Sequence, residues 1–131
     1  MKILLDTHIA AWATRHPERL SVAARSVLED LDHELWFSQV ALWEIAIKRE
    51  RPRPSTEGLP PTAELARQEF LQAGFLPLTI RDEHIFALQA VPLTHTDPFD
   101  RLLIAQSTVE GWRFLTHDRR LAHLSELVWL V

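Results

Sequence analysis

The stretch KILLDTHIAAWAT (residues 2–14) joins a short apolar run to a helical pattern through a single aspartate. KILL has the length and apolar character of a buried strand, and the pattern from about Thr7 to Thr14 predicts a helix. Asp6 therefore stands at a strand-to-helix junction, the repeating unit of α/β domains. We expect KILL to be one strand of a parallel sheet.

The same alternation continues along the whole chain. Further strands are expected at 35–37, 75–78 and 112–116, with a possible edge strand at 127–131. Helices are expected from Ser21 to about Leu31 and over 39–50, 62–73, 81–89 and 97–111. The segment RPRPSTEGLPP (51–61) holds four of the eight prolines and is expected to be a loop. These elements predict an α/β fold, one domain over residues 1–131, with a mainly parallel sheet of four to five strands.

Composition limits the classes of protein to consider. A chain of 131 residues with 47% hydrophobic and 24% charged residues is typical of a soluble globular domain. The absence of cysteine excludes disulfides and thiolate zinc sites. The start MKILLDTH is too short for a signal peptide, and no run approaches the roughly 18 apolar residues of a membrane span, so we expect a cytoplasmic protein. The net charge of −4 argues against a general basic surface for nucleic acid, although it is compatible with a nuclease whose acids gather in one site.

Two aspartates open the segment HTDPFDRLLIAQ (95–106). Asp97 suits the N-cap, Pro98 the first helical position and Asp100 the third, so a helix start alone explains them. Asp6 and Asp118 each follow an apolar strand, at the edge where an open α/β sheet forms its ligand crevice. A single aspartate there is more often a cap or a turn residue, but two such positions and the helix start together favour a site.

Glu44 lies among apolar residues in VALWEIAIK (40–48) and is expected to be at least partly buried. Its partner is either Lys48, one helical turn further on, or a cation, and this helix alone does not decide between them. Carboxylates about 4 Å apart repel by about 1 kcal/mol in water and by about 4 kcal/mol at an effective dielectric of about 20. A bound cation reverses this balance. Oxygen ligands favour Mg²⁺ or Mn²⁺, which suits phosphodiester chemistry.

Four blocks of the sequence, LLDTH (4–8), SQVALWEIAIK (38–48), HTDPFDRLLIAQ (95–106) and FLTHD (114–118), resemble the motifs of PIN-domain proteins of the VapC toxin type, in the same order. The resemblance implies a three-layer α/β/α fold and Mg²⁺- or Mn²⁺-dependent hydrolysis of RNA to 3′-hydroxyl and 5′-phosphate ends. It also implies a homodimer and a small VapB-like antitoxin that plugs the acidic site with an arginine. The implied catalytic and metal-binding acids are Asp6, Glu44, Asp100 and Asp118, with Asp97 as an additional member. Whether Asp97 or Asp100 contacts the metal more directly stays open.

Further polar residues near these acids are candidates for orienting them or for contacting substrate. Threonines beside strand ends can orient water or phosphate, but local hydrogen bonding is their commoner role. The histidines are expected to support ligands rather than to be ligands, because oxygen atoms suffice for Mg²⁺. For the five tryptophans, core packing or a subunit interface is favoured over stacking on RNA bases. The candidates are Thr7, His8, Lys48, His95, Arg101, Thr116 and His117.

Two other classes of function stay open on the sequence. A phosphorelay receiver domain has a similar length and strand-end aspartates, but this chain has no adjacent acidic pair at its first strand and no lysine after Lys48. A catalytically silent PIN domain that serves as a binding scaffold is the second alternative. The presence of the full acidic set disfavours it.

Overall fold

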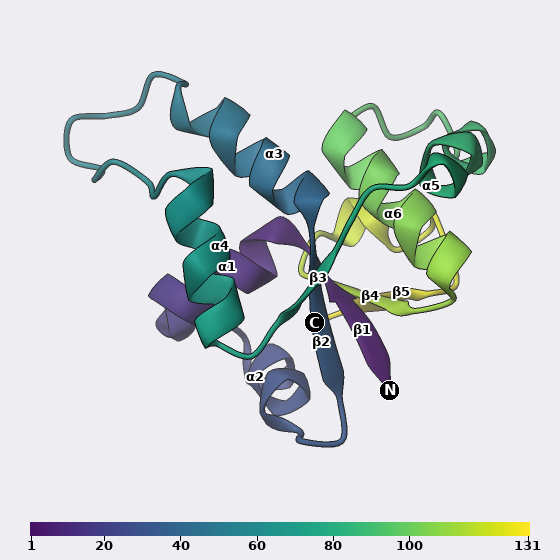
Figure 1. Ribbon diagram of the computed structural model, residues 1–131, viewed down its shortest axis with the longest axis horizontal. Helices are drawn as coiled ribbons and strands as arrows, with labels where there is room; N and C mark the ends of the chain where they lie inside the picture. The colour runs from purple at the N-terminus through teal and green to yellow at the C-terminus, as the bar shows by residue number, and fades with distance from the viewer.

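Five parallel strands form one sheet in the order β3-β2-β1-β4-β5 in the computed structural model, which describes residues 1–131 (Figure 1). The strands are β1 (Lys2–Leu5), β2 (Glu34–Ser38), β3 (Leu76–Leu78), β4 (Arg113–Thr116) and β5 (Val128–Leu130). The central strand β1 pairs with β2 through Leu4↔Trp36 and with β4 through Leu5↔Leu115. Because β1 and β4 are parallel neighbours, the residues that follow them lie at the same edge of the sheet. The prediction of an α/β domain with a mainly parallel sheet is confirmed.

Helices cover both faces of this sheet and give the three layers expected. They are α1 (Thr7–Arg15), α2 (Val22–Glu29), α3 (Gln39–Arg49), α4 (Ala63–Gln72), α5 (Asp82–Ala87) and α6 (Pro98–Glu110), with short 3₁₀ turns η1 (Pro17–Arg19), η2 (Leu88–Ala90) and η3 (Arg119–Leu121). The alternation of side chains along β1 divides the interior: Ile3 and Leu5 belong to a core with α1, α2 and α4, whereas Leu4 belongs to a core with α6. None of the helices has the length and apolar character needed to cross a bilayer.

The helix ends follow the expected local chemistry. Ser21 and Ser38 cap α2 and α3 through their hydroxyl groups, and Asp97 caps α6. At the end of α6, Gly111 adopts a left-handed conformation with φ 71°, which glycine adopts without steric cost.

The predicted end of the second helix is wrong. The helix stops at Glu29, and Leu31 lies beyond it with 98% of its surface exposed. The carboxylate of Asp30 accepts a hydrogen bond from the backbone N–H of Asp32 at 2.9 Å. This side-chain turn competes with the helix and ends it early.

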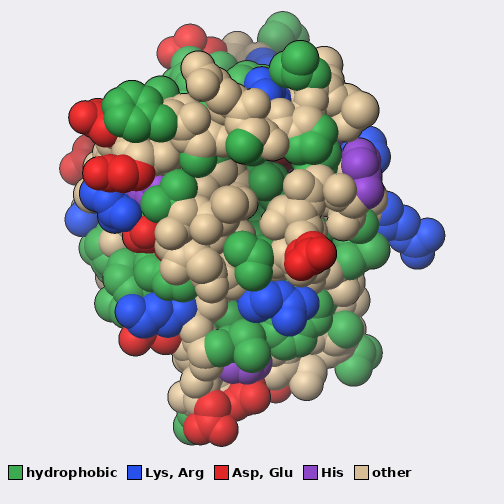
Figure 2. Space-filling view, turned by 90° about the vertical axis from the view of Figure 1, so that its right-hand side faces the viewer, with side chains coloured by type: hydrophobic (Ala, Val, Ile, Leu, Met, Phe, Trp, Pro, Cys, Tyr) green, Lys and Arg blue, Asp and Glu red, His purple; other side chains and the backbone are tan.

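The face of the molecule seen in Figure 2 mixes hydrophobic, acidic and basic side chains, with no broad region of a single sign of charge. This face therefore offers no general basic surface to a polyanion.

Candidate functional site

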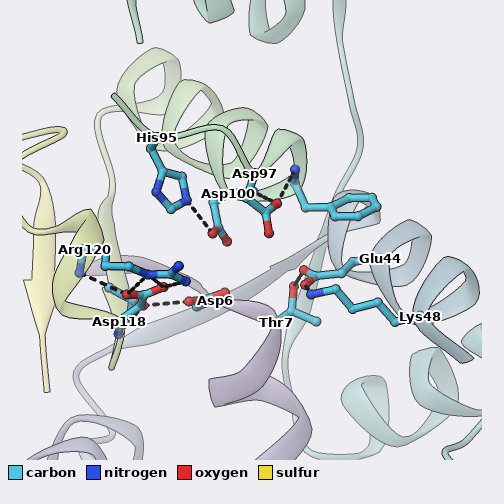
Figure 3. Close-up of polar contacts among 11 residues, drawn as sticks. Asp6, Thr7, Glu44, Lys48, His95, Asp97, Asp100, Asp118 and Arg120 are labelled. Carbon is cyan, nitrogen blue, oxygen red and sulfur yellow. Dashed lines mark hydrogen bonds and ion pairs between the residues drawn. The ribbon is translucent and has the colours of Figure 1, made fainter. Parts of the chain in front are cut away.

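Acids from four separate segments meet at the carboxyl edge of the sheet (Figure 3). Asp6 follows β1, Glu44 lies in the middle of α3, Asp97 and Asp100 open α6, and Asp118 follows β4. The parallel pairing of β1 with β4 and the docking of α3 and α6 over this edge bring them together. The structure thus gathers the acidic set that the sequence predicted.

Asp6 is almost completely buried, with an exposed fraction of 2%. The hydroxyl of Thr116 donates to Oδ2 of Asp6 at 2.6 Å, but the buried oxygen Oδ1 has no hydrogen-bond partner. Burial raises the pKa of Asp6 to about 7; the Thr116 hydrogen bond opposes this rise, and the negative charges of Asp100 and Glu44 add to it. A buried acid with an unpaired oxygen and acidic neighbours is a position that a cation would stabilise.

Glu44 is also 2% exposed, yet both of its oxygens are occupied. The hydroxyl of Thr7 donates to Oε1 at 2.6 Å, and the ammonium group of Lys48 binds Oε2. The predicted burial is confirmed, and of the two partners left open by the sequence the structure shows Lys48. Because the Lys48 side chain keeps 31% of its surface exposed, its ammonium group can reach another partner.

The two aspartates at the start of α6, Asp97 and Asp100, have different hydrogen-bond partners. Oδ1 of Asp97 accepts from the backbone N–H groups of Phe99 at 2.9 Å and of Asp100 at 3.2 Å, so this carboxylate is the helix cap. Asp100 is more deeply buried, and its Oδ2 lies 2.8 Å from Nε2 of His95. Burial raises the pKa of Asp100; the hydrogen bond with His95 opposes this, and the charges of Asp97 and Glu44 add to it.

Asp118 differs from the other acids because it is already paired with a cation. Its carboxylate accepts from Nη2 of Arg120 at 2.8 Å and also caps η3 through the backbone N–H of Arg120. The hydrogen bond from Arg120 holds the pKa of Asp118 below its usual value. Sequence reasoning missed Arg120, although an arginine two residues after a strand-end acid was the signal available.

No three acidic or histidine side chains form a preassembled metal-binding group. Two of the acids are instead paired with cations of the chain, Glu44 with Lys48 and Asp118 with Arg120. The donor set still fits a hard divalent cation, because it offers only carboxylate oxygens and includes the unpaired Oδ1 of Asp6. Binding of such an ion by Glu44 and Asp118 would require these two acids to exchange partners.

The remaining candidates divide into three groups. Thr7, Thr116 and His95 hydrogen-bond directly to the acids, as described above. The rings of His8 and His117 lie beside the site and pack with Trp12. Arg101 is not brought to the acids: its guanidinium group binds the carbonyl oxygens of the η2 turn and its C-cap, at Leu88 and Val91.

The tryptophans do not enter the fully buried cores. Four of them, Trp12, Trp36, Trp112 and Trp129, are partly buried against the two cores, whereas Trp43 is 46% exposed. Core packing therefore explains only part of the placement of these four tryptophans, and it does not explain the exposed Trp43.

A small polar pocket of about 410 Å³ lies next to the acids on the α6 side. Its lining has no hydrophobic residue, and four of its six residues were not predicted from the sequence: Thr94, Thr96, Arg120 and His123. The contact at 3.3 Å between Thr94 Oγ1 and His123 Nε2 joins segments 29 positions apart, which no local pattern reveals.

Comparison with known proteins gives consistent results. A sequence model of the PIN domain matches residues 3–127. The chain is 35% identical to Ribonuclease VapC22 of Mycobacterium tuberculosis over 127 residues, which cover 91% of this chain and 88% of that protein. Among solved structures, a chain of VapBC2 from Rickettsia felis bound to a promoter DNA fragment matches with a TM-score of 0.67 at 12% identity, covering 100% of this chain and 98% of that one. A chain of a toxin–antitoxin complex from Klebsiella pneumoniae matches with a TM-score of 0.63 at 12% identity, covering 98% and 99%. At this identity the two structural matches concern the fold alone.

Proposed function

The chain belongs to the PIN-domain family, and from this membership we propose that it is a VapC-type toxin, an endoribonuclease that depends on Mg²⁺ or Mn²⁺. The 35% identity to Ribonuclease VapC22 supports the ribonuclease activity. Family membership also removes the phosphorelay receiver from consideration. The choice that is left lies between a nuclease and a silent scaffold with the same fold.

One observation carries the nuclease proposal: the buried Oδ1 of Asp6 has no partner, while the carboxylates of Asp100 and Glu44 face the same space. Left without a cation, this arrangement costs stability and has no structural benefit. A scaffold would not need to keep it. The acids that would hold the ion are Asp6, Glu44, Asp97, Asp100 and Asp118.

A divalent cation bound by these acids would polarise the scissile phosphate and lower the pKa of an attacking water. The protein's own groups orient the ligands, since Thr116 fixes Asp6 and His95 fixes Asp100. Lys48 and Arg120 place positive charge beside the acids. Each becomes available to a phosphate oxygen when its carboxylate takes another partner.

The partners of this protein follow from the same family membership. We propose that it acts in the cytoplasm as a homodimer and that a small VapB-like antitoxin inhibits it by inserting an arginine among the acids. The structural similarity to chains from two toxin–antitoxin complexes supports an antitoxin partner. Light scattering on the isolated chain tests the dimer, which is contradicted if only a 15.2 kDa species is present.

The direct test is sequencing of 5′-phosphate RNA ends after brief expression of the chain without its antitoxin. New ends should appear at defined positions with the wild type and be absent with Asp6→Asn. In parallel, Mg²⁺ or Mn²⁺ should raise the melting temperature of the wild type but not that of Asp6→Asn combined with Asp100→Asn. Without metal, the double variant should melt higher than the wild type, because carboxylate repulsion is relieved. Metal-independent melting together with unchanged RNA ends would identify a silent scaffold.

A further inference from the structure

One polar side chain lies among the apolar residues of α6 and has no role in the site described above. Gln106 is fully buried, and residues 102–105 directly before it are apolar and buried as well. It lies nearly two helical turns after the site residue Asp100. A buried amide destabilises the fold unless its oxygen and its nitrogen both have partners. The partners of Gln106 therefore indicate what this residue does.

The side-chain amide of Gln106 connects α6 to three other segments. The hydroxyl of Ser38 donates to its Oε1, and its Nε2 donates to the carbonyl of Thr79 at 3.4 Å. Since a carbonyl only accepts, the nitrogen must face Thr79 and the oxygen must face Ser38. Nε2 also lies 3.3 Å from Nδ1 of His84, which already accepts from the backbone N–H of Arg81 at 3.0 Å and so carries no proton. Every polar atom of this amide thus has a partner.

Ser38 brings the start of α3 into this network. It is fully buried at the end of β2, and its hydroxyl oxygen accepts from the backbone N–H of Val40 at 2.9 Å as the cap of α3. A hydroxyl group has one proton and two lone pairs, so Ser38 can cap α3 and donate to Gln106 at the same time. The first turn of α3 is therefore bonded directly to the middle of α6.

The two helices touch at a second point, nearer the acids. Trp43 packs edge-on against Phe99 with 4.6 Å between ring centroids, and these residues directly precede Glu44 and Asp100. Aromatic pairs are favourable over centroid separations of about 4.5–7 Å, so this contact tolerates sliding. A hydrogen bond weakens steeply when its distance and angle change. The directional link that sets how α3 lies against α6 is therefore the one at Gln106.

We propose that Gln106 is a positioning residue: its hydrogen bond with Ser38 holds α3 against α6 and so sets the separation of Glu44 and Asp100 at which both can bind a divalent cation. The proposal rests on the metal-dependent nuclease function above and adds to it a residue that touches neither metal nor RNA. Two carboxylates repel each other when no cation is bound, so the helices that carry them need a link of defined length. A fully satisfied buried polar network supplies one, whereas an apolar side chain would only fill the space.

Two variants break this link, one from each helix. Gln106→Met replaces the amide by an apolar side chain of similar length and leaves the cap of α3 in place. Ser38→Ala removes the hydroxyl together with the cap. Ser107→Ala is the control for loss of a buried hydrogen bond, because this fully buried hydroxyl of α6 donates to the carbonyl of Trp112 at 2.7 Å. Ser21→Ala is the control for loss of a cap, since it removes that of α2.

The first readout is the distance between the two helices, which needs no metal. The chain has no cysteine, so Ala46→Cys and Val109→Cys, both at exposed positions, place one spin label on α3 and one on α6. The labelled chain is diluted with unlabelled chain, so that only distances within one chain are measured by double electron–electron resonance. The distance distribution should broaden or shift with Gln106→Met and with Ser38→Ala, and should keep its wild-type form with both controls. An unchanged distribution in the two test variants would overturn the proposal.

The second readout is chemical. Gln106→Met should weaken Mn²⁺ binding, measured by calorimetry, at least about tenfold, as expected when a residue that supports metal ligands is lost. In steady-state cleavage of a mapped RNA it should lower kcat at least about tenfold and leave KM unchanged, because the acids are misplaced but the surface that contacts RNA is not. Both controls should match the wild type. A changed helix distance with wild-type Mn²⁺ affinity and kcat would make Gln106 a purely structural residue and contradict the proposal.

The outcomes separate this proposal from the nuclease function. If the wild type binds Mn²⁺ and cleaves RNA while Gln106→Met matches it in every readout, the positioning role is wrong and the nuclease stands. If Gln106→Met changes the helix distance and weakens Mn²⁺ binding but the wild type cleaves no RNA, the nuclease proposal fails and Gln106 stands as a positioning residue of the metal site. A wild type that binds no Mn²⁺ would overturn both.

Discussion

The two most buried acids of the site, Asp6 at the start of α1 and Glu44 in the middle of α3, are equally inaccessible, at 2% exposed each, but their surroundings differ. Glu44 has a hydroxyl on one oxygen and an ammonium group on the other. Asp6 has a hydroxyl on one oxygen and no partner on the other. Burial alone therefore does not distinguish the roles of these two carboxylates.

From this difference we infer that Asp6, rather than Glu44, depends on a cation from outside the chain. A buried carboxylate with two partners, one of them charged, is stable without metal. A buried carboxylate with an unpaired oxygen is less stable in its charged form. Burial raises the pKa of Asp6 to about 7, and the nearby charges of Asp100 and Glu44 add to this rise. We infer that Asp6 is the centre of the metal site and that Glu44 joins it by releasing Lys48.

The largest expected effect is on cleavage by Asp6→Asn. Asparagine keeps the shape and can still accept from Thr116, but it removes the charge at the centre of the site. Cleavage of a mapped RNA at saturating Mg²⁺ should fall at least about a thousandfold, or about 4 kcal/mol in transition-state free energy. Single-turnover kinetics measure this. Cleavage within tenfold of the wild type would show that the unpaired oxygen of Asp6 has no part in the reaction.

The second expected effect concerns stability against pH without divalent cations. The folded pKa of Asp6 is about 7 against an ordinary 3.8, so the folded state holds a proton that the unfolded chain has released. The contribution of this proton to stability is complete below about pH 4 and is lost as the pH rises through about 7. The free energy of unfolding of the wild type should fall relative to Asp6→Asn by about 4 kcal/mol between pH 4 and pH 8. Urea titrations in EDTA measure it, and parallel pH profiles for the two chains would contradict it.

Glu44→Gln should have the next largest effect. Glutamine can still accept from Thr7, so the chain should fold, but the charge that holds the ion is lost. Cleavage should fall at least about a hundredfold, or about 2.7 kcal/mol, in single-turnover assays. Glu64→Gln, on an exposed residue of α4, is the matched control. If Glu44 only pairs with Lys48, cleavage by Glu44→Gln should match that of the control.

The smallest expected effect is that of substitutions at Asp97, which caps α6 and also places a charge near Asp100. Asparagine is as good an N-cap as aspartate, so Asp97→Asn should fold normally, whereas Asp97→Ala should lose about 0.5–2 kcal/mol of stability. Both should lower cleavage, by roughly tenfold, because both remove a charge near Asp100. Denaturant titration and cleavage assays on the two variants give the comparison. Normal cleavage by Asp97→Asn would make Asp97 a cap alone.

The fold was predictable because its signals are local. Each strand is a short apolar run, and Ser21, Ser38 and Asp97 mark helix starts that the structure confirms. The end of the second helix was not predictable. The helical pattern alone would continue to Leu31, but a turn made by the Asp30 side chain competes with it. This competition depends on the conformation of the Asp30 side chain, which cannot be read from the spacing of residues in the sequence.

The position of the five acids at one edge of the sheet was predictable, but the partners of their side chains were not. Strand ends, a buried glutamate in α3 and a helix start pointed to the five acids. The pairing of Asp118 with Arg120, the turn of Arg101 toward backbone carbonyls and the missing partner of Asp6 depend on side-chain positions in three dimensions. The contact between Thr116 and Asp6 joins residues 110 positions apart, which no window of sequence reveals.

The most direct test of the central claim, that a cation takes the place left open at Asp6, is the number of protons released when Mn²⁺ binds. Isothermal titration calorimetry in buffers of different ionisation enthalpy gives this number. Since the pKa of Asp6 is about 7, Asp6 is largely protonated at pH 6, and a metal that binds its carboxylate must displace the proton. We expect about one proton released for each ion at pH 6 and about none at pH 8. Binding of Mn²⁺ at pH 6 without proton release would contradict the claim.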